Sequence, residues 1–243
     1  LYMPLNSPHT PIVPSEKWQG KSGLSTYADF VMETDDAIGQ IMAATEQSGI
    51  AQNTLIIVTS DNGCSPSADF PLHLSKGHNP SYNLRGHKAD IFDGGHRVPF
   101  IVRWPAQVKG GQKTAQLTCL TDLMATTADI LGQKLPDNAA EDSFSFLPAL
   151  LGEKTARPSR ETLVLKSLAN GIFAVRKDRW KWIEGIPENR PAKAAPRPPA
   201  EELYDLTSDP SEKENVIKAH PDVAKDLRDT LNAIRDQGHS RAE

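Results

Sequence analysis

Three stretches of the chain place apolar residues at helical spacing. Between residues 25 and 48 they recur mostly every third or fourth position, and Gly49 supplies a C-terminal stop. Residues 120–131 give a second helical pattern closed by Gly132, and residues 221–236 give a third. The helix over 25–48 is predicted to be amphipathic, with Tyr27, Phe30, Val31, Ile38, Ile41 and Met42 apolar. The last helix places Val223, Leu227, Leu231 and Ile234 on one face.

Two apolar runs between the first two helices predict strands. Residues 54–59 form a continuous, β-branched run of the kind found in a central parallel strand covered on both faces. Residues 98–104 read as another strand, and residues 1–5 as the second half of a buried strand. Between residues 64 and 95 no period is visible, and an unpatterned loop of this length is usually functional.

The alternation of strands and helices up to residue 135 predicts an α/β domain with a mostly parallel central sheet. Beyond residue 136 the pattern changes, and residues 161–166, 171–175 and 180–184 read as short antiparallel strands. We therefore expect an α/β part over 1–135 and a smaller α+β subdomain, ending in a helix, over 136–243. Residues 187–199 hold five prolines and are predicted to be an exposed loop.

Composition excludes several classes of function. With 38% hydrophobic residues, 24% charged residues and a formal net charge of -4, the chain has no general attraction for nucleic acid or an anionic membrane. No run reaches the roughly 20 apolar residues of a membrane span, and no signal-peptide pattern opens the chain. Because it opens on half a strand, we expect the chain to be a fragment. Cys64 and Cys119 are too few for a disulfide scaffold.

Asp61 and Asn62 follow the first predicted central strand, at the carboxyl edge where open α/β sheets place their ligands. A carboxylate and an amide carbonyl are hard oxygen donors, suited to Ca²⁺ or Mg²⁺ rather than zinc. The sequence Asp-Asn-Gly is also common in turns. From these residues alone, a turn without a metal is at least as good an interpretation as a metal site.

The unpatterned loop concentrates cationic side chains in an acidic protein. A loop of this composition at the sheet edge would receive an anionic substrate, and its glycines allow close backbone approach. The alternative is a solvated surface loop; zinc is disfavoured because the histidine spacings match no familiar ligand pattern. The residues are His73, Lys76, His78, Arg85, His87, Lys88, His96 and Arg97.

Several spaced motifs together resemble the second half of type I sulfatases, in the right order and over nearly the whole chain. The similarity lies in Leu55-Ile56-Ile57-Val58-Thr59-Ser60-Asp61-Asn62-Gly63, Leu84-Arg85-Gly86-His87-Lys88 and the run from Asp93-Gly94-Gly95-His96-Arg97 to Pro105. Ser7-Pro8-His9-Thr10-Pro11 is similar to the histidine loop of that family, and Glu202-Leu203-Tyr204-Asp205-Leu206 to its C-terminal strand.

The resemblance implies that the chain is the C-terminal portion of an alkaline-phosphatase-like sandwich, in a periplasmic or secreted enzyme that hydrolyses sulfate esters, mostly of sulfated sugars. The chain alone is expected to be an incomplete, inactive portion of that enzyme. Residue by residue, it implies that Asp61 and Asn62 supply part of a calcium site and that Lys88 and His9 contact the sulfate. Such groups stabilise the negative charge that develops as the S–O bond breaks, and His9 could also protonate the leaving group. His78, Arg85 and His96 are candidate sugar contacts.

The family's nucleophile is a formylglycine made from the cysteine of a C-x-P-S-R motif, which we expect in the missing N-terminal part of the same enzyme. Cys64-Ser65-Pro66-Ser67-Ala68 is similar but lacks the arginine and follows the calcium motif instead of preceding it. Two alternatives stay open. A two-zinc phosphatase or phosphodiesterase of the same superfold is disfavoured by Asn62, a poorer zinc ligand than imidazole, and a non-catalytic module for sulfated glycans would need only the cationic loop.

Overall fold

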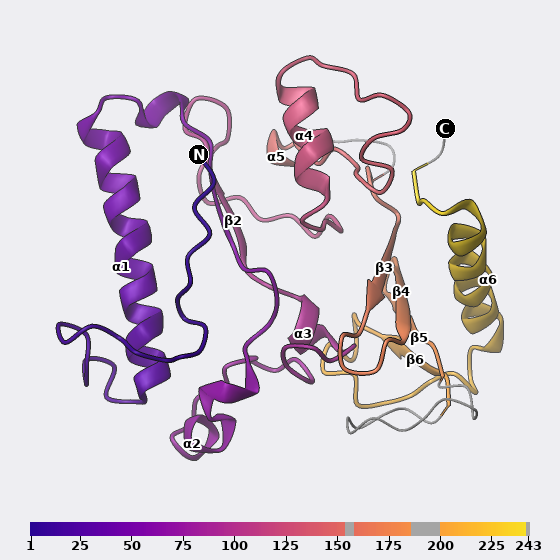
Figure 1. Cartoon of the computed structure of the whole chain (residues 1–243). Coiled ribbons are helices and arrows are strands. Elements are labelled where there is room, and N and C mark those ends of the chain that lie inside the picture. Colours follow the sequence, from indigo (N-terminus) through magenta and orange to yellow (C-terminus); the bar gives the residue numbers. More distant parts are fainter. Residues whose placement is uncertain (154–157, 186–199, 242–243) are drawn as a thin grey trace.

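The computed structural model describes residues 1–153, 158–185 and 200–241 (Figure 1). The predicted loop over 187–199 lies outside the described residues. One side of the molecule carries the helix α1 (Thr26–Gln47) and the strands β1 (Ile56–Thr59) and β2 (Phe100–Arg103). The other side carries a four-stranded sheet with the helix α6 (Pro221–Gln237) on its outer face.

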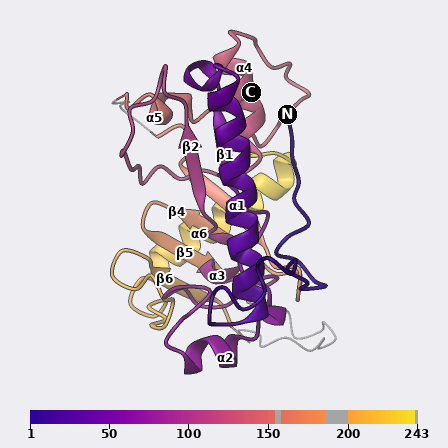
Figure 2. The ribbon, with the colours of Figure 1, turned by 90° about the vertical axis from the view of Figure 1, so that its left-hand side faces the viewer.

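Helix α1 confirms the first predicted helix. The side chain of Ser25 accepts a hydrogen bond from the backbone N–H of Ala28, which caps the N-terminus, and Gly49 follows the helix with a φ of 69°. Within the described structure Asp29 is the one residue of α1 that is fully buried. The predicted apolar face is thus only partly covered. The short helix η1 (Ala51–Asn53) then leads into β1, and Figure 2 shows α1 in front of the strands β1 and β2.

Strands β1 and β2 were both predicted, but they pair antiparallel, with Ile57 opposite Val102. The expectation that residues 54–59 lie in a parallel sheet is therefore wrong for this pairing. A continuous apolar run predicts burial and gives no direction for the neighbouring strand, which depends on how the connection turns the chain. Residues 1–5 form no strand, and Leu1 and Tyr2 are exposed because no described strand pairs with them.

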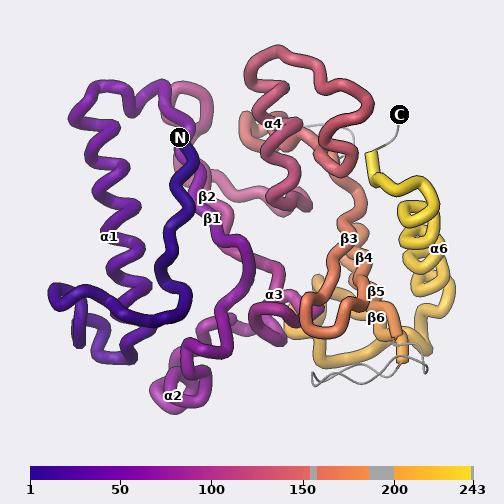
Figure 3. Tube along the Cα trace, in the orientation of Figure 1, coloured from indigo at the N-terminus to yellow at the C-terminus, as the bar shows by residue number. Residues whose placement is uncertain are grey.

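The unpatterned segment between β1 and β2 contains three short helices. They are η2 (Pro66–Ala68), α2 (Phe70–Ser75) and α3 (Asp93–His96). Helices of this length do not complete enough turns to produce a visible period, so periodicity could not predict them. The chain then passes from β2 through α4 (Asp122–Ile130) and α5 (Leu147–Leu150) into the second sheet, a path that Figure 3 follows.

The second sheet confirms the predicted antiparallel strands, in the order β3-β4-β5-β6. Alternate side chains face opposite sides of it. One face packs Val175, Trp182 and Leu203 against Ala224, Leu227 and Leu231 of α6. The strands are β3 (Thr162–Lys166), β4 (Phe173–Lys177), β5 (Trp180–Ile183) and β6 (Glu202–Asp205).

The other face of this sheet packs against the segment that connects β1 to β2. Ile91 and Phe92 of that segment share a core cluster with Ala174, Ile183 and Tyr204 of the sheet. The proposed division into 1–135 and 136–243 stays a prediction. If this division holds, Ile91 and Phe92, which belong to residues 1–135, contribute to the core of the subdomain 136–243.

Candidate active site

The turn after β1 holds Asp61 and Asn62 off the strand. The Ser60 hydroxyl donates to the Asn62 carbonyl at 2.9 Å, and the Asn62 amide nitrogen donates to the Gly63 carbonyl at 3.1 Å. With its nitrogen engaged in this way, Asn62 presents the Oδ1 atom as its remaining polar group. Asp61 is exposed beside it. Two hard oxygen donors therefore lie next to each other at the end of β1.

Two backbone hydrogen bonds join this turn to the cationic loop. The N–H of Gly63 donates to the Gly95 carbonyl at 3.0 Å, and the N–H of Lys88 donates to the Cys64 carbonyl at 2.9 Å. Lys88 is half-buried, and among the described residues its ammonium forms no hydrogen bond or ion pair. The fold thus fixes the backbone of Lys88 beside the Asp61-Asn62 turn and leaves its charge available for an anion.

His87 lies directly before Lys88 and was predicted only as part of the cationic loop. Its Nδ1 lies 3.0 Å from the Lys88 carbonyl and 3.5 Å from Oδ2 of Asp90, and the same carboxylate accepts from the His87 backbone N–H at 3.0 Å. These contacts close a tight turn around Lys88. Spacing along the chain could not reveal it, because Asp90 had no evident role in the sequence.

His9 lies on an exposed loop between two cis prolines, Pro8 and Pro11. Its Nδ1 lies 2.8 Å from the Thr10 carbonyl, so Nδ1 carries the proton and Nε2 is the acceptor in the neutral ring. The Thr34 hydroxyl, on α1, donates to the Ser7 hydroxyl at 2.9 Å and ties the loop to the helix. No hydrogen bond in the described part of the chain joins His9 to Lys88 or Asp61, so their convergence stays a prediction.

His78 lies beyond α2 and packs against a buried histidine. The rings of His73 and His78 are 5.2 Å apart, and His73 Nε2 is 2.7 Å from the Ser25 hydroxyl at the start of α1. Burial, helped by the neighbouring His78, lowers the pKa of His73. This pair joins α2 to α1. His78 itself is exposed, and its role as a sugar contact stays a prediction.

Arg85 and His96 lie in the layer between the loop and the second sheet. The Arg85 guanidinium donates to the Tyr204 hydroxyl at 3.0 Å and to the Glu212 carbonyl at 2.8 Å, and it stacks 3.6 Å from the centre of the Phe92 ring. The Nε2 atom of His96 is buried and has no partner among the residues described, and burial lowers the pKa of this histidine. Arg85 is exposed although its guanidinium bonds to Tyr204 and Glu212, and the roles of both residues toward a sugar stay predictions.

Cys64 is held as a thiol. Its Sγ donates to the Tyr27 hydroxyl at 3.3 Å, and burial raises its pKa. A nucleophilic cysteine needs the opposite shift, toward the thiolate. This environment disfavours a thiolate nucleophile at Cys64, and the place of the formylglycine stays a prediction.

The donor atoms at the β1 turn fit a hard cation but do not complete its shell. Asp61 and Asn62 offer oxygen ligands, whereas calcium takes 6–8 of them. No group of three or more His, Cys, Asp and Glu side chains that could hold a metal occurs within 1–153, 158–185 and 200–241. The remaining oxygens would have to come from substrate, solvent or other parts of the protein.

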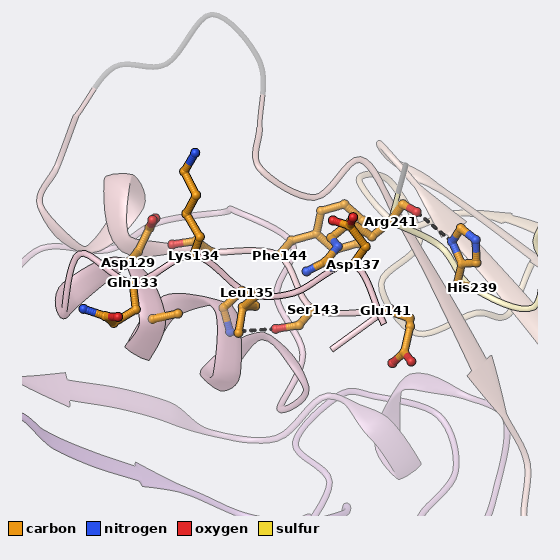
Figure 4. A pocket seen from close by; sticks show the side chains of 13 residues that line it. Asp129, Gln133, Lys134, Leu135, Asp137, Glu141, Ser143, Phe144, His239 and Arg241 are labelled. Carbon is orange, nitrogen blue, oxygen red and sulfur yellow. Dashed lines mark hydrogen bonds between the residues drawn. The ribbon is translucent and has the colours of Figure 1, made fainter. Parts of the chain in front are cut away.

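A cavity of about 480 Å³ lies apart from these residues, beside α4 (Figure 4). Both acidic and basic side chains line it, and none of the predicted site residues does. Its lining includes Asp129, Lys134, Asp137, Glu141, His239 and Arg241. No helix in the described part of the chain combines the length and the hydropathy needed to cross a membrane.

Comparisons with known proteins identify the family. The sequence model of the Sulfatase family matches residues 1–133, and that of the N-sulphoglucosamine sulphohydrolase C-terminal region matches residues 87–237. An N-acetylgalactosamine-6-O-sulfatase of Bacteroides thetaiotaomicron is 39% identical over 246 residues, which cover 97% of this chain and 47% of that protein. The chain thus spans about half the length of the curated relative.

Solved structures share the fold. One from a study of glycosaminoglycan metabolism by B. thetaiotaomicron matches with a TM-score of 0.86 and 38% identity, over 97% of this chain and 50% of that chain. The phosphonate monoester hydrolase of Agrobacterium radiobacter has a TM-score of 0.59 at 24% identity, over 87% of this chain and 41% of that chain, a likeness of fold alone. These neighbours confirm the α/β class. With a sequence model matched over more than half its length, the chain belongs to the sulfatase family.

Proposed function

We propose that the protein of which this chain forms part hydrolyses sulfate monoesters of a sulfated carbohydrate, and specifically a 6-O-sulfate on N-acetylgalactosamine. The name of the relative at 39% identity supports the choice of sugar and position. The observation that carries the proposal is the pair of backbone hydrogen bonds from Gly63 to Gly95 and from Lys88 to Cys64. They hold the backbone of Lys88 next to the Asp61-Asn62 turn, and the Lys88 ammonium has no partner in the part of the chain that the structure describes. A free ammonium near two hard oxygen donors would suit an anionic sulfate ester.

In this proposal Lys88 binds the peripheral sulfate oxygens and neutralises the charge that grows on them as the S–O bond breaks. His9 presents Nε2 to the ester, where a protonated ring would deliver a proton to the leaving oxygen. Asp61 and Asn62 would hold a calcium ion, or magnesium as the alternative. When bound, such an ion supplies positive charge that polarises the sulfate.

The proposal needs a nucleophile that these residues do not provide. We place it, as a formylglycine, in a part of the protein outside this chain, because Cys64-Ser65-Pro66-Ser67-Ala68 lacks the arginine of the C-x-P-S-R motif and follows the Asp61-Asn62 turn instead of preceding it. We also propose that the protein is periplasmic or secreted, because it would encounter sulfated polysaccharides outside the cytoplasm.

One experiment distinguishes the proposed sulfatase activity from the two alternatives, a phosphatase and a non-catalytic module for sulfated glycans. The full-length protein is incubated with N-acetylgalactosamine 6-sulfate, its 4-sulfate isomer and 4-nitrophenyl phosphate, and released sulfate or phosphate is quantified by ion chromatography. The proposal expects sulfate from the 6-sulfated sugar well above the other two. Faster release of phosphate would favour a phosphatase, and binding of the sulfated sugars without release would favour a non-catalytic module.

A further inference from the structure

The face of the second sheet that meets the cationic loop carries a row of polar side chains. Arg176 of β4, Lys181 of β5 and Tyr204 of β6 are directly opposite one another in the antiparallel register. Residues opposite on neighbouring strands lie on the same face. Ala174 and Ile183 beside the row are apolar. Glu202, opposite Ile183, accepts from the Tyr204 hydroxyl at 2.9 Å, which leaves the charged groups of Arg176 and Lys181 to find partners on other segments.

Lys181 finds its partners on two other segments. Its Nζ is 2.8 Å from Oδ1 of Asp93, which begins α3, and 2.8 Å from Oε1 of Glu212, which follows β6. The three side chains are 0%, 2% and 0% exposed. Burial alone would raise the pKa of Asp93, but the charges of Lys181, Arg176 and Arg97 outweigh it and hold that pKa below its ordinary value. Asp93 is therefore a carboxylate held by Lys181.

Glu212 closes a ring around the start of α3. Its Oε2 accepts from the Asp93 backbone N–H at 2.6 Å, its carbonyl accepts from Arg85 at 2.8 Å, and the Arg85 carbonyl accepts from the Gly94 N–H at 2.7 Å. Glu212 adopts a φ of 51°, which is uncommon for a residue other than glycine. Arg85, at the start of the segment 85–96, and Asp93, near its end, are thus both hydrogen-bonded to one buried glutamate.

The middle of the same segment is also tied to the sheet. The carbonyl of Ala89, the residue after Lys88, accepts from the Ser167 hydroxyl at 2.8 Å and from the Ala169 N–H at 3.2 Å. Ser167 and Ala169 lie between β3 and β4. The residues around Lys88 therefore take their position from the second sheet as well as from the β1 turn.

We propose that Lys181 is a positioning residue for sulfate binding: through Asp93 and Glu212 it fixes the segment 85–96, and with it Lys88, against the Asp61-Asn62 turn. The link runs from Lys181 to Asp93, through the Asp93-Gly94-Gly95 backbone to the Gly95 carbonyl, and on to Gly63. Lys181 itself touches none of the predicted sulfate contacts. This inference rests on the function proposed above.

A buried ion cluster suits this task better than apolar packing. Apolar contacts are not directional, so the segment could slide on the sheet at little cost. A lysine held between an aspartate and a glutamate has fixed distances and directions, and a displaced segment would leave the buried ammonium of Lys181 unpaired. Buried charges of this kind contribute to the choice of one arrangement even where they add little stability.

The test compares Lys181→Met with Lys177→Met in the full-length enzyme. Lys177 is a matched control, because it lies on the adjacent strand of the same sheet and pairs with Asp226 of α6 at 2.9 Å, on the opposite face. Two quantities are measured at a temperature where both variants are folded. One is kcat/KM for N-acetylgalactosamine 6-sulfate, and the other is hydrogen–deuterium exchange of the peptides covering 61–64, 85–96 and 162–166.

We expect Lys181→Met to lower kcat/KM by at least about 10-fold, since small displacements of catalytic groups are costly. Exchange should rise in 61–64 and 85–96 and stay unchanged in 162–166, while Lys177→Met matches the wild type in both measurements. Glu212→Gln, which keeps an oxygen acceptor for the Asp93 N–H, should show the same pattern to a smaller degree. If Lys181→Met does not fold, the Glu212→Gln variant tests the proposal in its place.

Three results would overturn the inference. Faster exchange with unchanged kcat/KM would make the cluster a purely structural feature, and lower kcat/KM with unchanged exchange would mean that the loss does not act through segment 85–96. Equal kcat/KM and equal exchange for Lys181→Met and Lys177→Met would show that Lys181 has no positioning role. A wild type that releases no sulfate would refute the proposed function instead, and the exchange data would still test whether Lys181 fixes the segment.

Discussion

Gly63→Ala tests the contact between the β1 turn and the cationic loop most sharply. A Cβ atom at Gly63 would lie 1.7 Å from the Gly94 carbonyl oxygen, 2.8 Å from its carbon and 3.1 Å from the Gly95 Cα. All three atoms belong to backbone, so no side chain can rotate away. Gly63 does not have a positive φ, so alanine suits its conformation and the effect of the change is steric alone.

The size of the effect follows from the overlap. To move from 1.7 Å to even 3.0 Å, the backbone of 94–95 must retreat by at least about 1.3 Å. This breaks the hydrogen bond from Gly63 to Gly95 and moves Lys88 relative to Asp61. Overpacking costs about 1–3 kcal/mol of unfolding free energy, and the lost hydrogen bond about 1 kcal/mol more. A displacement of about 1 Å at a reaction centre lowers kcat/KM about 10²-fold.

Thermal unfolding and 4-nitrophenyl sulfate turnover of the full-length protein measure both effects. Gly39→Ala is the control, because Gly39 lies within α1 with nothing within 4 Å of the added Cβ. It should stabilise the helix by up to about 1 kcal/mol and leave turnover unchanged. A Gly63→Ala enzyme with the wild-type kcat/KM would refute the claim that this contact sets the geometry of the site.

Four further changes have defined outcomes. Asp61→Ala should weaken calcium binding in calorimetry and lower turnover with it, whereas unchanged affinity would remove Asp61 from the cation site. Lys88→Ala should cost about 3 kcal/mol of transition-state stabilisation, about 10²-fold in kcat/KM, and a near wild-type value would make Lys88 a solvated loop residue. His78→Ala should raise KM for the sulfated sugar and leave aryl sulfate kinetics unchanged, and equal losses would place His78 beside the sulfate. Because the folded-state pKa of His73 is lowered from 6.5, the unfolded chain binds the proton first. Its stabilising contribution is present above about pH 6.5 and is lost below it, so His73→Asn should flatten the pH dependence of unfolding there, and an unchanged slope would contradict this assignment.

The elements with a clear period were predictable from the sequence. Residues 25–48 and 221–236 contain enough turns for an apolar face to repeat, and the short strands after residue 160 are marked by β-branched and aromatic residues. Pairing direction was not predictable, because the burial of residues 54–59 is the same beside a parallel or an antiparallel neighbour. The turn with Asp61 and Asn62 was predictable as a feature of a strand end, since strand ends expose polar groups.

The buried cluster of Lys181, Asp93 and Glu212 could not be predicted from the sequence, because it joins residues that are far apart along the chain. Lys181 and Asp93 are 88 positions apart, and Asp93 and Glu212 are 119 apart. One local signal was present: Trp180 and Trp182 alternate with Lys181 and Ile183, so a lysine shares a strand face with isoleucine. A lysine on an apolar face needs a buried carboxylate, and Asp93 was the acidic residue within the motif that the sequence had already singled out.

We propose sulfate-ester hydrolysis in which this chain supplies binding groups and a nucleophile outside it attacks sulfur. The most direct measurement is sulfate release from N-acetylgalactosamine 6-sulfate by the full-length protein, with the wild type beside Cys64→Ala. We expect release by both at similar rates, because Ala68 stands where the C-x-P-S-R motif has its arginine, so Cys64 is not expected to be converted to formylglycine. No release by the wild type, or release that Cys64→Ala abolishes while the protein stays folded, would contradict it.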